Sequence, residues 1–508
     1  MNETNHPLRS GPSLEVALDP RALARQFEGV YFSNGRFEQP GGAATYPLRS
    51  PATQELLANV ATCSHDDVDR TVRAAAEAQR SWARLPATER AALVTRAANT
   101  LDAHKEELAR LVALETGKAL RTECRGEAMA AGQMFLFYAG LATELKGETL
   151  PPRPDMMAIT KREPIGVVAA ILPWNAPVAL AAVKAAPALV AGNAVIIKAA
   201  EEAPLGVMRL VQLMNRVLPP GVLNVLCGDG PTTGDPLVKH PLVRKITFTG
   251  SVETGRIIAR NAADKLVPVT LELGGKSPMI VMPDADLEKA VEGALVGMRF
   301  TRQGQSCSAC SRIFVHANLI EAFVDGLKAR VDTLKMGDPL EEETDIGTIV
   351  SQAQFDKVRQ YIRLGQELPG VKAIFCSQLP TSEHLAAGFY VRPVLFVGAD
   401  NDSRIASEEI FGPVACIIPF TDYEQALQQA NASEYGLTAT IWTRDLHTAL
   451  DAANRLEAGY VQINQSAVAG LGPPYGGFKN SGLGKELSLR AMLDHFTREK
   501  TILINMSK

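Results

Sequence analysis

Residues 167–198 read VVAAILPWNAPVALAAVKAAPALVAGNAVIIK. Two short apolar runs, 167–172 and 194–197, enclose a longer apolar segment with the composition of a buried helix. This pattern predicts a strand, a helix and a second strand. Runs of the same kind recur at 245–248 and 267–271, each followed by a helical stretch. Such alternation indicates an α/β protein with a largely parallel sheet.

The chain is expected to form two lobes. Its 508 residues exceed the ~250 to 300 residues over which one hydrophobic core keeps growing. A second alternating series begins near Gly274 and predicts a second α/β lobe. Its strands are expected at 279–281, 313–315, 414–419 and 438–442. Before the first sheet, apolar residues three and four apart over 65–119 predict helices, which Pro86 interrupts.

Three segments around the lobes have a different composition. Residues 1–27 are polar and lack an apolar core segment, which predicts a flexible arm and no signal peptide. The prolines within 151–154 and the glycine-rich segment 470–484 are candidate hinges or crossings. The tail 496–505 alternates charged and β-branched residues, so an edge strand is expected there, which an oligomer would pair.

Composition narrows the class of function. The net charge of -4 gives no field that would attract nucleic acid. Proline and lysine interrupt the longest apolar segment, 176–191, so no membrane span is expected, and the chain is expected in the cytoplasm. The 7 cysteines are sparse and odd in number, which argues against a disulfide framework. The 8 histidines have no zinc-site spacing, and no metal is expected.

The segment QGQSCSAC, residues 303–310, contains a cysteine in a small polar loop after an apolar helix. Small neighbours leave the thiol of Cys307 reachable, and a helix terminus or a nearby base would lower its pKa and make it a nucleophile. A buried structural cysteine is the alternative interpretation. Cys307 and Cys310 also form a CxxC pair, which is a weak redox signal by itself.

Two polar residues follow predicted strands. Glu272 ends a strand in VPVTLELGGKSP (267–278), at the sheet edge where ligands bind, so it is a candidate general base for water. Asn175 lies in the PWNAP turn (173–177) and is a candidate hydrogen-bond donor to an oxyanion. A solvated carboxylate and an ordinary Asn-Pro turn are the alternatives.

A nucleotide signal follows two other strands. In ITFTGSVETG (246–255) a strand leads through a glycine turn into a helix whose free amides would bind phosphate. It is not the GxGxxG fingerprint, so alone it is weak. Lys198 and Glu201 follow another strand, where an acid would hold ribose hydroxyls; a polar loop is the alternative.

Several motifs occur together and in a fixed order: PWNAP, KAAE, FTGSVETG, LELGGKSP, GQSC, EEIFGPV and PYGGFKNSG. From about Phe32 to its end the chain thereby resembles the aldehyde dehydrogenase superfamily. The resemblance implies an α/β fold with a Rossmann-like NAD-binding domain, an α/β catalytic domain and a small β oligomerisation element. It assigns residues 28–146 and 165–272 to the first, 273–475 to the second, and 147–164 and 483–508 to the third.

The resemblance also implies a reaction, the NAD-dependent and hydrolytic oxidation of an aldehyde to a carboxylate. Cys307 would be the nucleophile and Glu272 the base that activates the water. Asn175 and the Cys307 amide would form the oxyanion hole. Lys184 and Glu486 match positions tied to proton traffic.

For the cofactor, the resemblance implies that Lys198 and Glu201 hold the adenosine ribose and that Ser251 holds the pyrophosphate. The remaining cofactor positions are Trp174, Gly230, Gly250, Thr254, Leu273, Glu409 and Phe411, the last two at the nicotinamide end. NAD is favoured because Glu201 would repel a 2′-phosphate, although NADP is possible. A homodimer or homotetramer joined through the terminal strand is implied.

Departures from the family pattern leave alternatives open. Cys310 replaces a common glycine, which allows a Cys307–Cys310 disulfide under oxidation. Ala176, Val183 and Thr301 replace aromatic residues, which suggests a wide substrate tunnel. The rival enzyme is a CoA-acylating aldehyde dehydrogenase, which needs no water-activating base. The rival of another class is a silent structural or redox-sensing relative.

Overall fold

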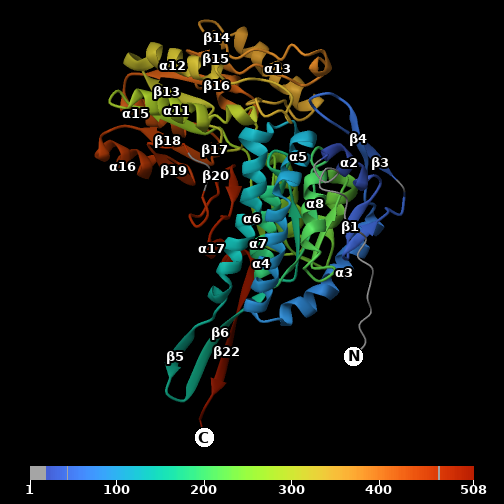
Figure 1. Ribbon diagram of the computed structural model, residues 1–508. Helices are drawn as coiled ribbons and strands as arrows, with labels where there is room; N and C mark the ends of the chain where they lie inside the picture. Colours follow the sequence, from blue (N-terminus) through green and yellow to red (C-terminus); the bar gives the residue numbers. More distant parts are fainter. Residues whose placement is uncertain (1–18, 43, 467–469, 508) are drawn as a thin grey trace.

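The computed structural model describes residues 19–42, 44–466 and 470–507. Figure 1 shows two lobes, each built on a sheet with helices on its faces, and a narrow arm of three strands below the first lobe. The C-terminus lies at the far end of this arm. Two short ribbons complete the sheets: β3 (Thr45–Arg49) with β4 (Leu56–Ala61), and β17 (Tyr435–Gly436) with β20 (Phe478–Lys479).

The first lobe contains an eight-stranded sheet. Its strands in spatial order are β2 (Arg36–Glu38), β1 (Tyr31–Ser33), β9 (Leu223–Leu226), β8 (Ala194–Lys198), β7 (Val167–Ile171), β10 (Val243–Thr249), β11 (Val269–Glu272) and β21 (Gly482–Leu483). The five strands from β9 to β11 are parallel, which confirms the predicted parallel sheet.

Both faces of this sheet are buried, which explains why β7 is apolar throughout. Val168 and Ala170 point into one core, and Val167 and Ala169 point into another. The helices of the first core include α4 (Ala87–Ala103), α5 (Lys105–Thr116), α6 (Arg125–Gly140), α7 (Pro177–Val190), α8 (Leu205–Met214) and α17 (Leu489–Phe496). Those of the second are α3 (His65–Arg84), α9 (Asp235–Lys239) and α10 (Val252–Ala263).

The second lobe contains a seven-stranded sheet. Its strands in order are β14 (Lys372–Phe375), β15 (Val394–Val397), β16 (Val414–Phe420), β13 (Arg312–His316), β12 (Pro278–Val281), β18 (Thr438–Trp442) and β19 (Tyr460–Ile463). One core contains α11 (Leu287–Gly297) and α12 (Ile320–Asp332); the other contains α13 (Gln352–Gln366), α14 (Arg404–Ser407), α15 (Tyr423–Asn431) and α16 (Leu446–Arg455). The four strands expected here are present, within one residue at each end.

Short helical turns connect these elements. They are α2 (Pro20–Ala24), η1 (Arg25–Phe27), η2 (Leu120–Cys124), η3 (Ala142–Glu144), η4 (Gly230–Gly234), η5 (Phe300–Arg302), η6 (Ala317–Leu319) and η7 (Glu383–Leu385). The first two correct the prediction of a flexible arm over 1–27. Residues 1–18 lie outside the described residues, but Leu23 and Phe27 are buried in the core of the first lobe, so residues 20–27 are folded against this lobe.

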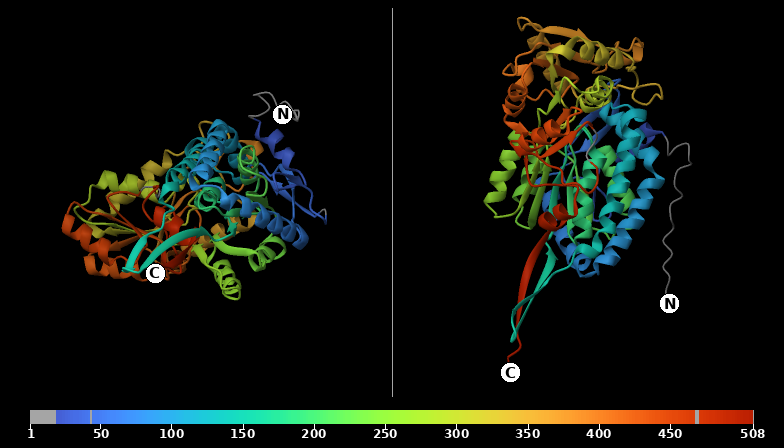
Figure 2. Two further views of the ribbon diagram at one scale, coloured as in Figure 1. Left: turned by 90° about the horizontal axis from the view of Figure 1, so that it is seen from below. Right: turned by 90° about the vertical axis from the view of Figure 1, so that its left-hand side faces the viewer.

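The arm consists of β22 (Thr497–Asn505), β6 (Met156–Pro164) and β5 (Thr149–Arg153). Figure 2 shows it projecting from the body of the molecule. The prolines at 151 and 152 do not form a hinge; they lie in β5, an edge strand, where a missing backbone N–H is tolerated. The arm also begins later than residue 483, because Met492 and Phe496 of α17 pack in the core of the first lobe.

The glycine-rich segment 470–484 crosses between the lobes, one of the two roles predicted for it. Its strand β20 pairs with β17, and its strand β21 then joins the first sheet beside β11. Gly482 has φ +159, and a Cβ there would lie 2.4 Å from the Leu271 carbonyl oxygen. The crossing therefore needs a residue without a side chain.

Candidate active site

A cavity of about 670 Å³ lies between the two lobes. Residues of both sheets and of α6 and α7 line it. The predicted site residues that line it are Trp174, Asn175, Gly250, Ser251, Glu272, Leu273, Cys307, Glu409, Phe411 and Glu486. Lys184, Lys198, Glu201, Gly230 and Thr254 are not among the described residues of its lining. Most of the predicted catalytic set therefore shares one cavity.

The parallel strands bring these residues to one edge of the first sheet. The register pairs Ile171 with Lys198, and Thr249 with Glu272. The sheet also has a topological switch point at this edge, because β8 and β9 lie on one side of β7 and β10 and β11 on the other. Ligands of open α/β sheets bind at such a point.

A tight turn presents Cys307. Gln303 and Gly304 have left-handed backbone angles, φ 55 and φ 64, so the chain reverses sharply after η5. Gln305 then fixes the loop, since its side-chain oxygen accepts the Val350 N–H at 3.0 Å. Gly275 lets the loop pack closely, because a Cβ there would lie 2.5 Å from the Cys307 carbonyl oxygen.

The thiol of Cys307 is protonated in this environment. Burial raises its pKa to about 12, and the negative charges of Glu272 and Glu409 act in the same direction. The Tyr475 hydroxyl, 4.0 Å from Sγ, opposes the shift. The expected lowering of this pKa is therefore wrong for the protein alone, because neither a base nor a helix terminus outweighs the desolvation.

Glu272 ends β11 and is also buried. Within the described part of the chain its Oε1 has no hydrogen-bond partner. Burial, followed by the charge of Glu486, raises the pKa of Glu272 well above its ordinary value. Glu486 itself is paired with Lys184, whose Nζ lies 2.8 Å from Oε1 of Glu486. A carboxyl group with a raised pKa and a free oxygen is suited to accept a proton from water.

Asn175 is anchored from both sides. Its carbonyl oxygen accepts a hydrogen bond from Lys118 Nζ at 2.8 Å, and its Nδ2 donates to the Gln305 carbonyl at 3.2 Å. Lys118 forms a buried ion pair with Glu127, whose other oxygen accepts the Val178 N–H at 3.0 Å. The side-chain amide of Asn175 is thereby fixed to the backbone of Gln305, which lies two positions before the nucleophile in the sequence.

The positions expected to bind a dinucleotide lie along the same edge. Lys198 Nζ lies 3.4 Å from Oε2 of Glu201, and the side chain of Glu201 is 45% exposed. Ser251 caps α10 by accepting the Thr254 N–H at 3.2 Å. At the other end, Glu409 accepts the Gly275 N–H at 2.9 Å. The rings of Trp174 and Phe411 make an edge contact there, with centroids 5.3 Å apart.

Several polar residues at the site were assigned no role from the sequence. They are Lys118, Glu123, Glu127, Arg299, Arg302 and Tyr475. Most of them lie in or beside helices without a motif, and only spatial contact relates them to Cys307. Thr301 is not among the described lining residues of the cavity, because its hydroxyl donates a hydrogen bond to Glu123. Of the three positions that suggested a wide substrate tunnel, only Ala176 and Val183 line the cavity.

The structure also bears on disulfides, metal sites and membrane spans. All seven cysteines are free, and Cys310 lines the cavity with Cys307. Over the described ranges, no cluster of three His, Cys, Asp or Glu side chains has a metal-binding arrangement. In the same ranges no helix has the length and hydropathy of a membrane span.

Known proteins are similar to this chain in sequence and in fold. The model of the aldehyde dehydrogenase family matches residues 38–502. The protein DhaS of Bacillus subtilis (strain 168) is 38% identical over 478 residues, which cover 94% of this chain and 95% of DhaS.

Solved structures agree. The NAD+ complex of an aldehyde dehydrogenase from Bacillus cereus is 37% identical with a TM-score of 0.91, covering 98% of this chain and 99% of that one. Betaine aldehyde dehydrogenase from Staphylococcus aureus in complex with NAD+ is 34% identical with a TM-score of 0.92, covering 97% and 98% of the two chains. With its two α/β lobes and a shared cavity, this chain belongs to the aldehyde dehydrogenase family.

Proposed function

We propose that the protein oxidises an aldehyde to a carboxylic acid with NAD+ and water, through a thioester on Cys307. The observation that supports this most is that Cys307, Glu272 and Asn175 line one cavity. The carboxyl group of Glu272 favours hydrolysis over transfer to CoA, because its free oxygen can take a proton from water.

The residues along the sheet edge suit a dinucleotide. The cap of α10 offers backbone amides and the Ser251 hydroxyl to a phosphate group. The carboxylate of Glu201 would accept hydroxyl hydrogens of a ribose and repel a 2′-phosphate, so NAD is proposed before NADP. When bound, NAD+ supplies the acceptor for the hydride that leaves the substrate carbon.

In the first half-reaction, Sγ of Cys307 attacks the aldehyde carbon and forms a thiohemiacetal. The carbonyl oxygen becomes an oxyanion, which Asn175 Nδ2 and the Cys307 N–H are proposed to stabilise. Such donors are each worth about 100- to 1,000-fold in rate. Loss of hydride from the same carbon leaves a thioester on Cys307.

In the second half-reaction, Glu272 removes a proton from water, and the resulting hydroxide attacks the thioester carbon. The tetrahedral intermediate uses the same oxyanion donors and then releases the carboxylic acid and the sulfur of Cys307. The Lys184–Glu486 pair, whose charge already acts on Glu272, is proposed to take the proton onward.

The arm supports a proposed homodimer or homotetramer. Strand β22 lies at one edge of its sheet, and the side chains of Leu150, Leu503 and Ile504 are exposed on the arm. An unpaired edge with exposed apolar side chains favours association with another copy. The free cysteines suit a reducing compartment, and the cytoplasm is proposed as the location.

The test is NADH formation from a panel of aliphatic, aromatic and carboxylate-bearing aldehydes. The wild-type protein should produce NADH and carboxylic acid in equal amounts without CoA. Replacing the nucleophile, Cys307→Ala, should abolish both products. Aldehyde-dependent NADH formation by this variant at the wild-type rate would refute the proposal.

A further inference from the structure

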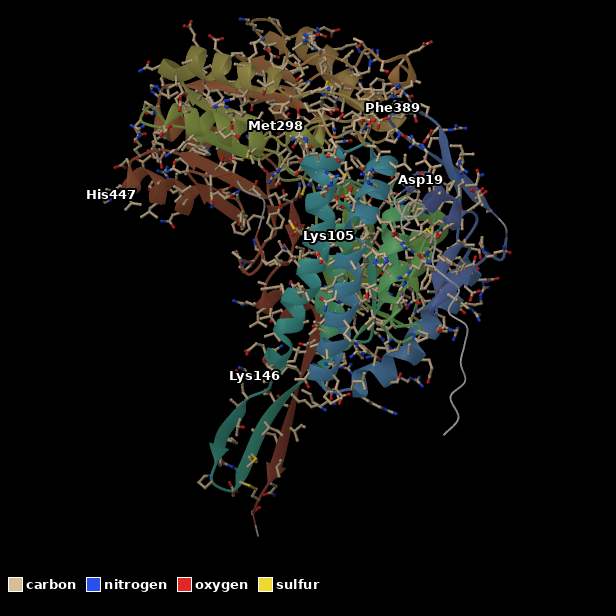
Figure 3. All side chains as sticks on the ribbon, in the orientation of Figure 1. Asp19, Lys105, Lys146, Met298, Phe389 and His447 are labelled. Carbon is tan, nitrogen blue, oxygen red and sulfur yellow. The ribbon has the colours of Figure 1, made fainter. Side chains whose placement is uncertain are left out.

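Arg299 is a cation of the cavity without a counter-ion among the described residues. It follows α11 in a left-handed turn (φ 58, ψ 44) and lines the same cavity as Cys307. Its guanidinium makes no hydrogen bond or ion pair within the described ranges, and no nitrogen of it is sealed from the cavity. Figure 3 labels the preceding residue, Met298, where the second lobe meets the upper ends of the first-lobe helices.

The acidic groups near Arg299 are already paired. Glu123 forms an ion pair with Arg302 at 2.6 Å. Although burial opposes ionisation, Arg302 holds the pKa of Glu123 below its ordinary value, so this carboxylate is charged and occupied. Glu127 is paired with Lys118. Neither acid forms an ion pair with Arg299, although the charge of Glu123 still acts on it.

A half-buried guanidinium without a partner costs free energy, because it has lost part of its hydration and gained no hydrogen bond. The effect is visible in the pKa of Arg299, which burial and then the charge of Arg302 lower. A planar carboxylate is the group that best matches a guanidinium, because it accepts two parallel hydrogen bonds.

The location of Arg299 assigns it to the substrate end of the cavity. Its electrostatic neighbours include Cys310 and Tyr475, and the Tyr475 hydroxyl lies 4.0 Å from Sγ of Cys307. A ligand that reaches Arg299 therefore extends from Cys307 toward the substrate side.

We propose that the substrate is an aldehyde with a second, anionic end, a semialdehyde whose carboxylate binds Arg299 while its carbonyl carbon lies at Cys307. This inference rests on the proposed function, since it names the class of aldehyde. The carboxylate stays unchanged in the reaction and serves to hold the substrate, so the product is a dicarboxylate.

The first experiment compares charged and neutral substrates of equal length. Succinic, glutaric and adipic semialdehydes are assayed beside their methyl esters, which keep the aldehyde and remove the charge. The wild-type protein should have a higher kcat/KM for at least one semialdehyde than for its ester. A wild type that prefers no semialdehyde over its ester would overturn the proposal.

Variants then locate the effect. Arg299→Met keeps much of the side-chain volume and should lower the semialdehyde-to-ester ratio of kcat/KM by about 10- to 100-fold, chiefly through KM, because a charged hydrogen bond is lost. Arg299→Lys should recover part of the ratio. The control is Arg490→Met, since this side chain is 87% exposed on α17 and lies outside the cavity. An unchanged ratio in Arg299→Met would refute the role of Arg299.

A binding assay separates this inference from the proposed function. Glutarate should protect Cys307 of the wild-type protein from iodoacetamide better than neutral glutaramide does. The Arg299→Met variant should lose this preference for glutarate, and the Arg299→Lys variant should retain it. Equal protection by the two compounds would overturn the inference. Absence of NADH from every aldehyde would instead defeat the proposed function, and the protection assay would still decide the role of Arg299.

Discussion

Replacing Glu272 by glutamine should separate the two half-reactions. Glutamine has the same shape but cannot take a proton from water. In Glu272→Gln the thioester should therefore form on Cys307 and then persist. Since Oε1 of Glu272 has no partner in the described structure, the substitution breaks no hydrogen bond of that atom, and a neutral amide is easier to bury than a carboxylate. The protein should therefore fold normally.

The magnitude follows from the role. A positioned general base contributes about 100- to 10,000-fold in rate, so steady-state turnover should fall by that factor. The first turnover should survive, and stopped-flow mixing with aldehyde and NAD+ should show a burst of about one NADH per active site. Mass spectrometry of the quenched protein should find the acyl group on Cys307. Steady-state turnover at the wild-type rate, or a protein without burst or acyl adduct, would refute the assignment.

The same variant tests the electrostatics. In the wild type, the raised pKa of Glu272 keeps this group neutral at low pH, so hydrolysis should increase as pH rises through a value well above the ordinary ~4.3 of a glutamate. Glu272→Gln should lack this ascending limb. Because the Glu272 charge raises the pKa of Cys307, its removal should shift the pH profile of iodoacetamide alkylation to lower pH.

Three further predictions concern the neighbours of the nucleophile. Asn175→Ala should lower kcat about 100- to 1,000-fold while NAD+ binding, followed by fluorescence, is retained; unimpaired kcat would remove Asn175 from the oxyanion hole. Tyr475→Phe should raise the pH at which alkylation of Cys307 is half-maximal, because in the wild type the Tyr475 hydroxyl lowers the pKa of Cys307. An unchanged midpoint pH would contradict this contact. Glu127→Gln leaves Lys118 buried without its counter-charge, which should cost about 3 to 5 kcal/mol of unfolding free energy and lower Tm; a melting curve like the wild type's would show that the pair contributes little.

The sequence was sufficient for the parts of the fold that depend on local pattern. The apolar runs at 167–172 and 194–197 became β7 and β8 because a strand buried on both faces needs apolar residues at every position. The candidate residues Asn175 and Glu272 were found because they follow such strands, and parallel strands bring their carboxyl ends to one edge.

Other properties of the site depend on contacts between distant residues. Lys118 supports Asn175 across 57 positions of sequence, and it lies outside any motif. The pKa of Cys307 depends on burial by residues of both lobes, which a loop rich in serine and glycine did not reveal. Residues 20–27 are likewise folded against the first lobe because two apolar side chains, Leu23 and Phe27, are buried there. The polar composition of the segment as a whole did not indicate this burial.

The raised pKa values of Cys307 and Glu272 fit a reaction in which the two groups carry negative charge in turn. While the thiol is free, a charged Glu272 opposes its ionisation, so the nucleophile is formed most easily when Glu272 is protonated. Once the sulfur is bound in a thioester it carries no charge, the repulsion ends, and Glu272 can ionise and accept a proton from water. One cavity can therefore serve both proposed half-reactions, because covalent capture of the substrate itself changes which group holds the charge.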